Sequence, residues 1–275
     1  MIFSDRDIAT LNDILVQAGD REIVPRFCRI NDADIKEKEA SWDVVTEADT
    51  AAEKYISAAL LQHYPNARIV GEEAAAEDPS VIEGLGDTDL AFVIDPVDGT
   101  YNFASGMPTF GTILAVVVGG ECVAGIIHYP IGGESLVGVA GGGSRLIDEQ
   151  GNAEPVKVAA PVTLDQMVGT VSWGFMSEPQ RSRVAGNLSK IGMSFGFRCS
   201  AWEYRLAATG RAHFVSAQNL MPWDHLAGVL IHEEAGGYSA CVDGERYRPG
   251  IVEGGLITAS DRDCWELIRR EIFDA

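Results

Sequence analysis

The sequence predicts a layered α/β fold, and three features of its pattern support this. Amphipathic helical stretches alternate with short apolar runs along the 275 residues. Several of the apolar runs are joined by the glycine-containing turns typical of hairpins. Two of the runs end directly in paired acidic residues, and the carboxyl ends of strands are where α/β folds place their functional sites.

The first half of the chain predicts two helices followed by a series of strands. Apolar residues at helical spacing predict a helix over residues 5–18, and a second helix begins near Asp49 and stops before Pro65. Residues 74–89, rich in Ala, Glu, Asp and Gly, are expected to form a mobile loop or a short helix with a loop, and are a candidate lid. Strands are expected at 67–70, 90–94, 110–118, 122–129 and 134–140, with a further hairpin within 144–158.

The second half repeats the alternation of strands and helices. Asp243 and Gly244 predict a turn into a return strand, and Trp173 and Trp202 are expected to pack in the core, with a pocket wall as the alternative. Strands are expected at about 168–173, 194–199, 213–215, 238–242 and 256–259, and helices at 178–190, 201–209, 224–235 and 261–273. No repeat or low-complexity linker interrupts the chain. We therefore expect one domain over residues 1–275, with subdomains of about 1–155 and 156–275 and the site between them.

Composition narrows the classes of partner. Asp plus Glu number 41 against 21 Lys plus Arg, a net charge of −20. Such acidity counts against a broad nucleic-acid or anionic-membrane surface, and the longest apolar run is far short of a membrane span. The five cysteines include no CxxC pair, and no signal-peptide pattern opens the chain. We expect reduced, mostly buried thiols in a cytoplasmic protein with neither a nucleic-acid nor a membrane partner.

The most informative segment is residues 95–100, Asp-Pro-Val-Asp-Gly-Thr, directly after the apolar run 90–94. Two carboxylates separated by two residues therefore lie where a buried strand ends. Pro96 stiffens the backbone between them, and Gly99 permits a close turn. Carboxylates this near one another repel unless a cation lies between them, and oxygen ligands without His or Cys favour a hard ion such as Mg²⁺. A solvated turn is the alternative for this segment taken alone.

Further acids occur at the starts of other expected elements. Glu72 and Glu73 follow the short apolar run 67–70, at a second strand end. Asp49 and Asp224 each precede a helical pattern, and capping the helix N-terminus is their simplest role. Taken singly, each of these acids has an ordinary explanation as a loop or cap residue.

Taken together, the four segments resemble the inositol monophosphatase family of Mg²⁺-dependent, lithium-sensitive sugar phosphatases. The family's GEE-type, D-P-[IV]-D-G-T and W-D-x-x-A-G elements occur here in the same order at 71–73, 95–100 and 223–228. The upstream D-x-V-T-x-x-D stretch occurs at 43–49. Each motif alone is weak, but the ordered set is specific and spans essentially the whole chain. The resemblance implies an αβαβα layered fold and a homodimer.

The resemblance also implies a role for each matching residue. The implied metal ligands are Glu72, Asp95, the backbone carbonyl of Val97, Asp98 and Asp224. The implied catalytic set is Thr100 and Asp49, which orient the attacking water, with Glu72 beside the first metal ion. The implied substrate and phosphate contacts are Asp98, Gly99, Thr100, Ser200 and Ala201, with Cys199 in place of the family's glycine.

These residue types suit hydrolysis of a phosphate ester by metal-activated water. Mg²⁺ offsets the charge of the phosphate, lowers the pKa of a bound water and aligns it, and a second ion can stabilise the leaving alkoxide. Mg²⁺ needs only a few carboxylates because it keeps several waters. We expect two or three Mg²⁺ ions, with Mn²⁺ as a substitute, and a phosphomonoesterase acting on a small polyol or sugar phosphate similar to inositol 1-phosphate.

Departures from the family pattern leave the substrate open. Seven residues before Asp224 the family carries a Glu that contacts inositol hydroxyls, and this chain has Ala217. Tyr101 follows Thr100 where a second Thr is usual. A site built to hydrogen-bond a sugar loses discrimination when a polar partner is lost. The alternative substrates are 3′-phosphoadenosine 5′-phosphate, histidinol phosphate and fructose 1,6-bisphosphate; the non-enzyme alternative is an accessory binding protein of a transcription complex.

Overall fold

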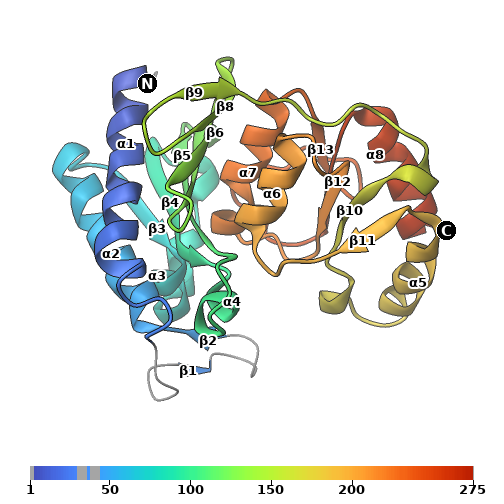
Figure 1. The fold of residues 1–275 in the computed structure, drawn as a ribbon, viewed down its shortest axis with the longest axis horizontal. Coiled ribbons are helices and arrows are strands. Elements are labelled where there is room, and N and C mark those ends of the chain that lie inside the picture. The colour runs from blue at the N-terminus through green and yellow to red at the C-terminus, as the bar shows by residue number, and fades with distance from the viewer. Residues whose placement is uncertain (1–2, 30–35, 38–43, 275) are drawn as a thin grey trace.

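Two β-sheets alternate with three layers of helices in the computed structural model, which describes residues 3–29, 36–37 and 44–274 (Figure 1). This arrangement confirms the expected αβαβα fold. The helices are α1 (Asp5–Ala18), α2 (Glu47–His63), α3 (Glu72–Glu77), α4 (Thr100–Ala104), α5 (Gln180–Asn187), α6 (Ser200–Ala208), α7 (Pro222–Glu234) and α8 (Arg262–Ile268).

The larger sheet has seven strands in the order β3-β4-β5-β6-β7-β8-β9. Only the β3–β4 pair is parallel, and the other neighbours are antiparallel, as short hairpin connections require. The strands are β3 (Arg68–Gly71), β4 (Leu90–Asp98), β5 (Gly111–Val118), β6 (Glu121–Tyr129), β7 (Glu134–Val139), β8 (Gly143–Ile147) and β9 (Ala153–Pro155). A separate two-stranded pair joins β1 (Lys36–Glu37) to β2 (Val44–Val45).

The smaller sheet has five strands in the order β11-β10-β12-β14-β13. Its strands are β10 (Val168–Val171), β11 (Met193–Phe195), β12 (Phe214–Ala217), β13 (Tyr238–Cys241) and β14 (Leu256–Ala259). The chain passes from one sheet to the other through residues 156–167.

Each sheet is covered on both faces by helices with buried apolar stripes. α1 and α2 pack on the outer face of the larger sheet, where Ile8, Leu11 and Leu15 of α1 are at most 1% exposed. α6 and α7 lie between the sheets, and α8 covers the outer face of the smaller one (Figure 1). The central layer therefore carries residues of α6 and α7 to the junction of the two sheets.

Several local expectations were wrong. Asp49 and Asp224 are not N-cap residues, because each is the third residue of its helix, and the caps are Thr46 and Met221. No return strand follows Asp243 and Gly244, since β13 pairs with the later strand β14. Trp173 is 38% exposed and stacks with Arg181 instead of packing in the core.

Other expectations are confirmed. Residues 72–77 form the short helix α3, with 3₁₀ turns at Pro79–Ile82 and Leu85–Asp87. None of the five cysteines forms a disulfide, and three of them are buried. Asp43, which opens the D-x-V-T-x-x-D stretch, lies outside the described residues.

Candidate metal centre and active site

A β-bulge turns Asp95 and Asp98 of β4 toward the same side of the sheet. Asp95 pairs with Ile113 and Asp98 with Gly111, so β4 advances three residues while β5 advances two. In a regular strand, residues three apart face opposite sides, and the one extra residue of a bulge reverses this. Pro96 lies in the bulge, where a residue without an N–H leaves no ladder bond unmade. The sequence D-P-V-D thus places both carboxylates together.

Asp224 approaches the same point from α7. One carboxylate oxygen from each of Asp95, Asp98 and Asp224 lies within 4.8 Å of the others. Glu72, at the start of α3, lines the same cavity as Asp98 and Asp224. Acids from both halves of the chain therefore converge where the sheets meet.

Burial and mutual repulsion act strongly on these carboxyl groups. Burial raises the pKa of Asp95 and of Asp224 well above its ordinary value, and neighbouring negative charges, including Glu72, add to the effect. Burial also raises the pKa of Asp98 to about 6. Asp95 Oδ1 is buried without a hydrogen-bond partner. A divalent cation bound by oxygen ligands would satisfy that atom and relieve the repulsion, so the residues fit a metal centre.

Asp98 is also tied to the N-terminus of α6. Its carboxylate accepts hydrogen bonds from Ser200 N at 3.1 Å, Cys199 Sγ at 3.0 Å and Ala201 N. Since a carboxylate has about four acceptor sites, these three donors leave room for a metal ion. The expected substrate-wall residues Ser200 and Ala201 thus direct their amides to Asp98. Ser200 also lines the cavity, whereas the side chain of Ala201 is fully buried.

Glu53 of α2 holds the segment that carries Glu72, a role that the sequence did not reveal. Its carboxylate accepts from Glu73 N at 2.8 Å and Ala74 N at 3.0 Å, and so caps α3. Gly71 makes room for it, because a Cβ there would lie 2.3 Å from the Glu53 carboxyl carbon. The glycine of the GEE motif therefore reports the close approach of a buried carboxylate.

Asp49 and Thr100 are joined by a hydrogen bond across the chain. Thr100 Oγ1 lies 3.0 Å from Asp49 Oδ1 and 2.9 Å from the Val97 carbonyl oxygen. Either of these two oxygens can accept the hydrogen bond from its hydroxyl. The other Asp49 oxygen accepts from Thr46 N at 2.8 Å, in a capping box that fixes the carboxylate. Burial raises the pKa of Asp49 to about 7. Gly99 precedes Thr100 with φ +87°, a left-handed conformation that favours glycine.

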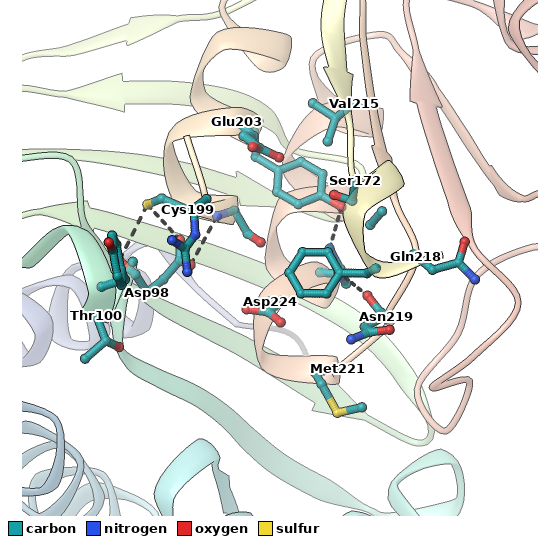
Figure 2. Close-up of a pocket in the computed structure, with 18 of the residues that line it drawn as sticks. Asp98, Thr100, Ser172, Cys199, Glu203, Val215, Gln218, Asn219, Met221 and Asp224 are labelled. Carbon is teal, nitrogen blue, oxygen red and sulfur yellow. Dashed lines mark hydrogen bonds between the residues drawn. The ribbon is translucent and has the colours of Figure 1, made fainter. Parts of the chain in front are cut away.

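A cavity of about 540 Å³ adjoins the carboxylates. Figure 2 shows Asp98 and Thr100 on one side of it and Gln218 and Asn219 on the other, with Asp224 between them. Its lining residues are Val44, Glu72, Asp98, Gly99, Thr100, Tyr101, Ser172, Phe175, Arg198, Cys199, Ser200, Glu203, Tyr204, Val215, Ala217, Gln218, Asn219, Met221, Asp224 and His225. The volume suits a small organic phosphate.

Two titratable groups of this wall lie away from the carboxylate cluster. Glu203 accepts from Thr170 Oγ1 and from Phe197 N, each at 3.2 Å, and burial raises its pKa to about 7. His225 is buried, and burial lowers its pKa to about 4. Its Nε2 lies 2.9 Å from the Asn219 carbonyl, which can only accept. Its Nδ1 lies 3.1 Å from the Tyr204 hydroxyl, so both ring nitrogens are held by structural contacts.

Comparison with known proteins agrees with this arrangement. A profile of the inositol monophosphatase family matches residues 9–272. The chain belongs to the inositol monophosphatase family. This is a family of phosphate monoester hydrolases that generally depend on metal ions, and the relatives named phosphatases imply small phosphorylated substrates.

Individual relatives carry several names. The chain is 32% identical over 253 residues to the protein named Nus factor SuhB of Pseudomonas aeruginosa, which covers 87% of this chain and 86% of the relative. It is 33% identical over 220 residues to the histidinol-phosphatase of Chlorobaculum parvum, covering 79% of each. The solved structure of a Thermotoga maritima IMPase superposes with a TM-score of 0.80 at 25% identity, covering 98% of this chain and 96% of the other. Among the described helices, none is both long and apolar enough to cross a membrane.

Proposed function

We propose that this protein is a Mg²⁺-dependent phosphomonoesterase that hydrolyses a small polyol or sugar phosphate. The observation that carries the proposal is the convergence of Asp95, Asp98 and Asp224, with a buried Asp95 oxygen that has no partner. Mutually repelling buried carboxylates at the edge of a cavity are what a site for divalent cations requires.

The proposed ligands divide between two ions. Glu72, Asp95 and the carbonyl of Val97 would hold the first, and Asp95, Asp98 and Asp224 the second. Bound Mg²⁺ would neutralise the phosphate and supply a water of lowered pKa. The fixed positions of the carboxylates, set by the bulge in β4 and by Glu53 beneath α3, support this assignment. We propose that two or three Mg²⁺ ions are bound during turnover and that Mn²⁺ can substitute for them.

Thr100 and Asp49 are proposed to orient the attacking water. When the Thr100 hydroxyl donates a hydrogen bond to Asp49, its oxygen keeps lone pairs that can accept a hydrogen bond from the attacking water. Asp49 is fixed by Thr46 and therefore fixes the Thr100 rotamer in turn. The Asp49–Thr100 pair therefore affects the geometry of attack rather than substrate binding, so its loss should lower kcat more than it raises KM.

The proposed substrate is held at the other side of the cluster. Asp98 and the amides of Gly99 and Thr100 would contact the phosphate, and Ser200 and Ala201 would border the alcohol part. At Ala217 this chain lacks the glutamate that contacts inositol hydroxyls in the family. The polar residues Gln218 and Asn219 line the cavity beside it. Substrates of the histidinol phosphate, adenosine bisphosphate and fructose bisphosphate type therefore remain within the proposal.

A binding role in a transcription complex is not favoured, although the relatives from Pseudomonas aeruginosa and Pasteurella multocida are named Nus factors. Every acid expected in the metal centre is present, and the three aspartates are brought together. We further propose one domain with subdomains of about 1–155 and 156–275, a homodimer, a cytoplasmic location and inhibition by lithium, as the family pattern suggests.

Hydrolysis of a panel of phosphate esters, with Mg²⁺ and with EDTA, tests the proposal. We expect the wild type to release phosphate in a reaction that EDTA abolishes and Mg²⁺ restores. The Asp95→Asn variant should release none, although its circular dichroism spectrum should match that of the wild type. A folded wild-type protein that releases no phosphate from any ester with Mg²⁺ or Mn²⁺ would contradict it.

A further inference from the structure

Arg198 adopts a backbone conformation that is costly for an arginine. Its φ is +54°, and it stands immediately before Cys199, the N-cap residue of α6. Non-glycine residues are uncommon in this left-handed region, and their presence at the edge of a functional site points to a role for the side chain. Glycine would adopt the same conformation without strain.

The guanidinium of Arg198 lies over an aromatic ring from the other half of the molecule. Its central carbon is 3.9 Å from the ring centroid of Tyr101, the residue after Thr100. Tyr101 is 38% exposed, and both residues line the cavity. When a guanidinium lies over a ring, its N–H groups point outward in its own plane, alongside the ring face, and can donate hydrogen bonds to a ligand.

Arg198 is positively charged in a cavity whose other charged residues are acidic. It is the single lysine or arginine among the described residues that line the cavity, whereas Glu72, Asp98, Glu203 and Asp224 are acidic. Metal ions at the carboxylate cluster would offset most of that negative charge. The arginine then stands as a fixed cation on the wall next to the proposed phosphate site.

We propose that Arg198, supported by Tyr101, binds a second anionic group of the substrate, a phosphate or a carboxylate, while the reacting phosphate lies at the carboxylate cluster. The preferred substrates are then phosphate esters that carry a second anion. Guanidinium groups bind both anions through paired charge-assisted hydrogen bonds. This inference rests on the proposed function, because it places the reacting phosphate at the metal centre.

The test compares two esters that differ by one anionic group, glycerol 2-phosphate and 2-phosphoglycerate. Affinities are measured by calorimetry with Ca²⁺ in place of Mg²⁺ to slow turnover, and KM and kcat are measured with Mg²⁺. The wild type should bind 2-phosphoglycerate about 10-fold to 100-fold more tightly than glycerol 2-phosphate, the range for a hydrogen bond to a charged group. A parallel pair, fructose 1,6-bisphosphate and fructose 1-phosphate, tests a phosphate as the second anion.

Arg198→Gly is the decisive variant, since glycine suits the backbone at this position and the fold should keep its melting temperature. We expect the affinity ratio between the two esters to fall to near one, through KM and not kcat. Arg198→Lys should restore part of the ratio. The matched control is Arg181→Gln, which removes an equal charge from an arginine that also stacks on an exposed aromatic ring, Trp173, outside the cavity lining. That control should keep the wild-type ratio.

Three results would overturn the inference. The first is a wild type that binds the two esters equally. The second is an Arg198→Gly variant that weakens both esters by the same factor, which would place Arg198 on the reacting phosphate. The third is an Arg181→Gln variant that lowers the ratio as much as Arg198→Gly does. If the wild type binds both esters but hydrolyses neither, the proposed function fails, and the binding ratio still decides the role of Arg198.

Discussion

The two ends of the cavity are built in different ways. At the carboxylate end, backbone features fix the side chains: a bulge for Asp95 and Asp98, and a capping box for Asp49. At the substrate end, single side chains such as Arg198 and Ala217 project from loops and strand ends. The positions of the carboxylates at the first end change only if the backbone changes, whereas the shape and charge of the second end can be altered by one substitution. The chemistry is therefore fixed more firmly than the choice of substrate.

Removing one carboxylate from the first end should have the largest effect. Asp95→Asn is expected to lower kcat/KM at least about 1,000-fold on every ester, the order seen when a key electrostatic stabiliser is lost. The exposed Asp165→Asn serves as the control and should behave as the wild type. The measurement is the loss of kcat/KM relative to the wild type, taken for each ester. A loss that is large for some esters and small for others would contradict the difference between the two ends.

The pH dependence of stability tests the same carboxylates without turnover. The folded-state pKa values of Asp49 and Asp98, about 7 and about 6, lie above the ordinary 3.8, so their ionised forms are disfavoured in the fold. Their contribution to the free energy of unfolding is therefore fully present below about pH 4. It is lost as the pH rises from there to about 6 for Asp98 and about 7 for Asp49, at about 1.4 kcal/mol per unit of pKa shift.

Mg²⁺ should reverse that loss by stabilising the ionised carboxylates. The difference in melting temperature between Mg²⁺ and EDTA should be larger at pH 8 than at pH 5. The buried histidines titrate in both samples, so their contribution cancels from the difference. An equal or smaller difference at pH 8 would show that the carboxylates do not bind the ion.

Cys199 joins the two ends, because its thiol contacts the Asp98 carboxylate. Cys199→Ala removes this donor and should raise the Mg²⁺ concentration for half-maximal activity about 10-fold, the lower range for loss of a group that orients a metal ligand. Cys199→Ser keeps a donor and is the matched control. Equal Mg²⁺ requirements for the Ala and Ser variants would remove the thiol from this role.

A change confined to the substrate end should have the smallest effect. Ala217→Glu is expected to raise kcat/KM for inositol 1-phosphate only a few-fold relative to other esters, because one added polar partner improves discrimination without touching the cluster. The ratio of kcat/KM values for inositol 1-phosphate and glycerol 2-phosphate measures it. An unaltered substrate ranking would show that position 217 does not select substrates in this chain.

The sequence predicted the layered fold and the acids of the cluster because both depend on local patterns. Apolar periodicity marks a strand or a helix wherever it occurs, and D-P-V-D-G-T carries its own turn chemistry. The cap positions were misplaced because Thr46 and Met221, rather than the acids, begin the two helices. The hairpin at Asp243 was wrong because β14, much later in the chain, offered a better-buried partner strand.

The substrate wall was less predictable because it depends on contacts between distant residues. Glu203 reads as an ordinary helix residue until Thr170, from β10, is seen to bond it. Arg198 and Tyr101 are almost a hundred positions apart, and no local pattern pairs them. We propose that Arg198, whose left-handed backbone favours glycine, rather than Cys199, whose φ is −161°, stands at the position of the family's glycine.

The bulge at Pro96 makes the enzyme sensitive to chain length as well as to side-chain chemistry. A single residue inserted into β5 between Gly111 and Ile113 would restore a regular ladder. Asp95 and Asp98, three residues apart, would then face opposite sides of the sheet. Replacing Pro96 or Val97 would adjust affinity or rate by degrees, whereas this insertion would remove a whole carboxylate from the cluster. Both strands should therefore tolerate replacement of their other residues far better than an insertion opposite the bulge.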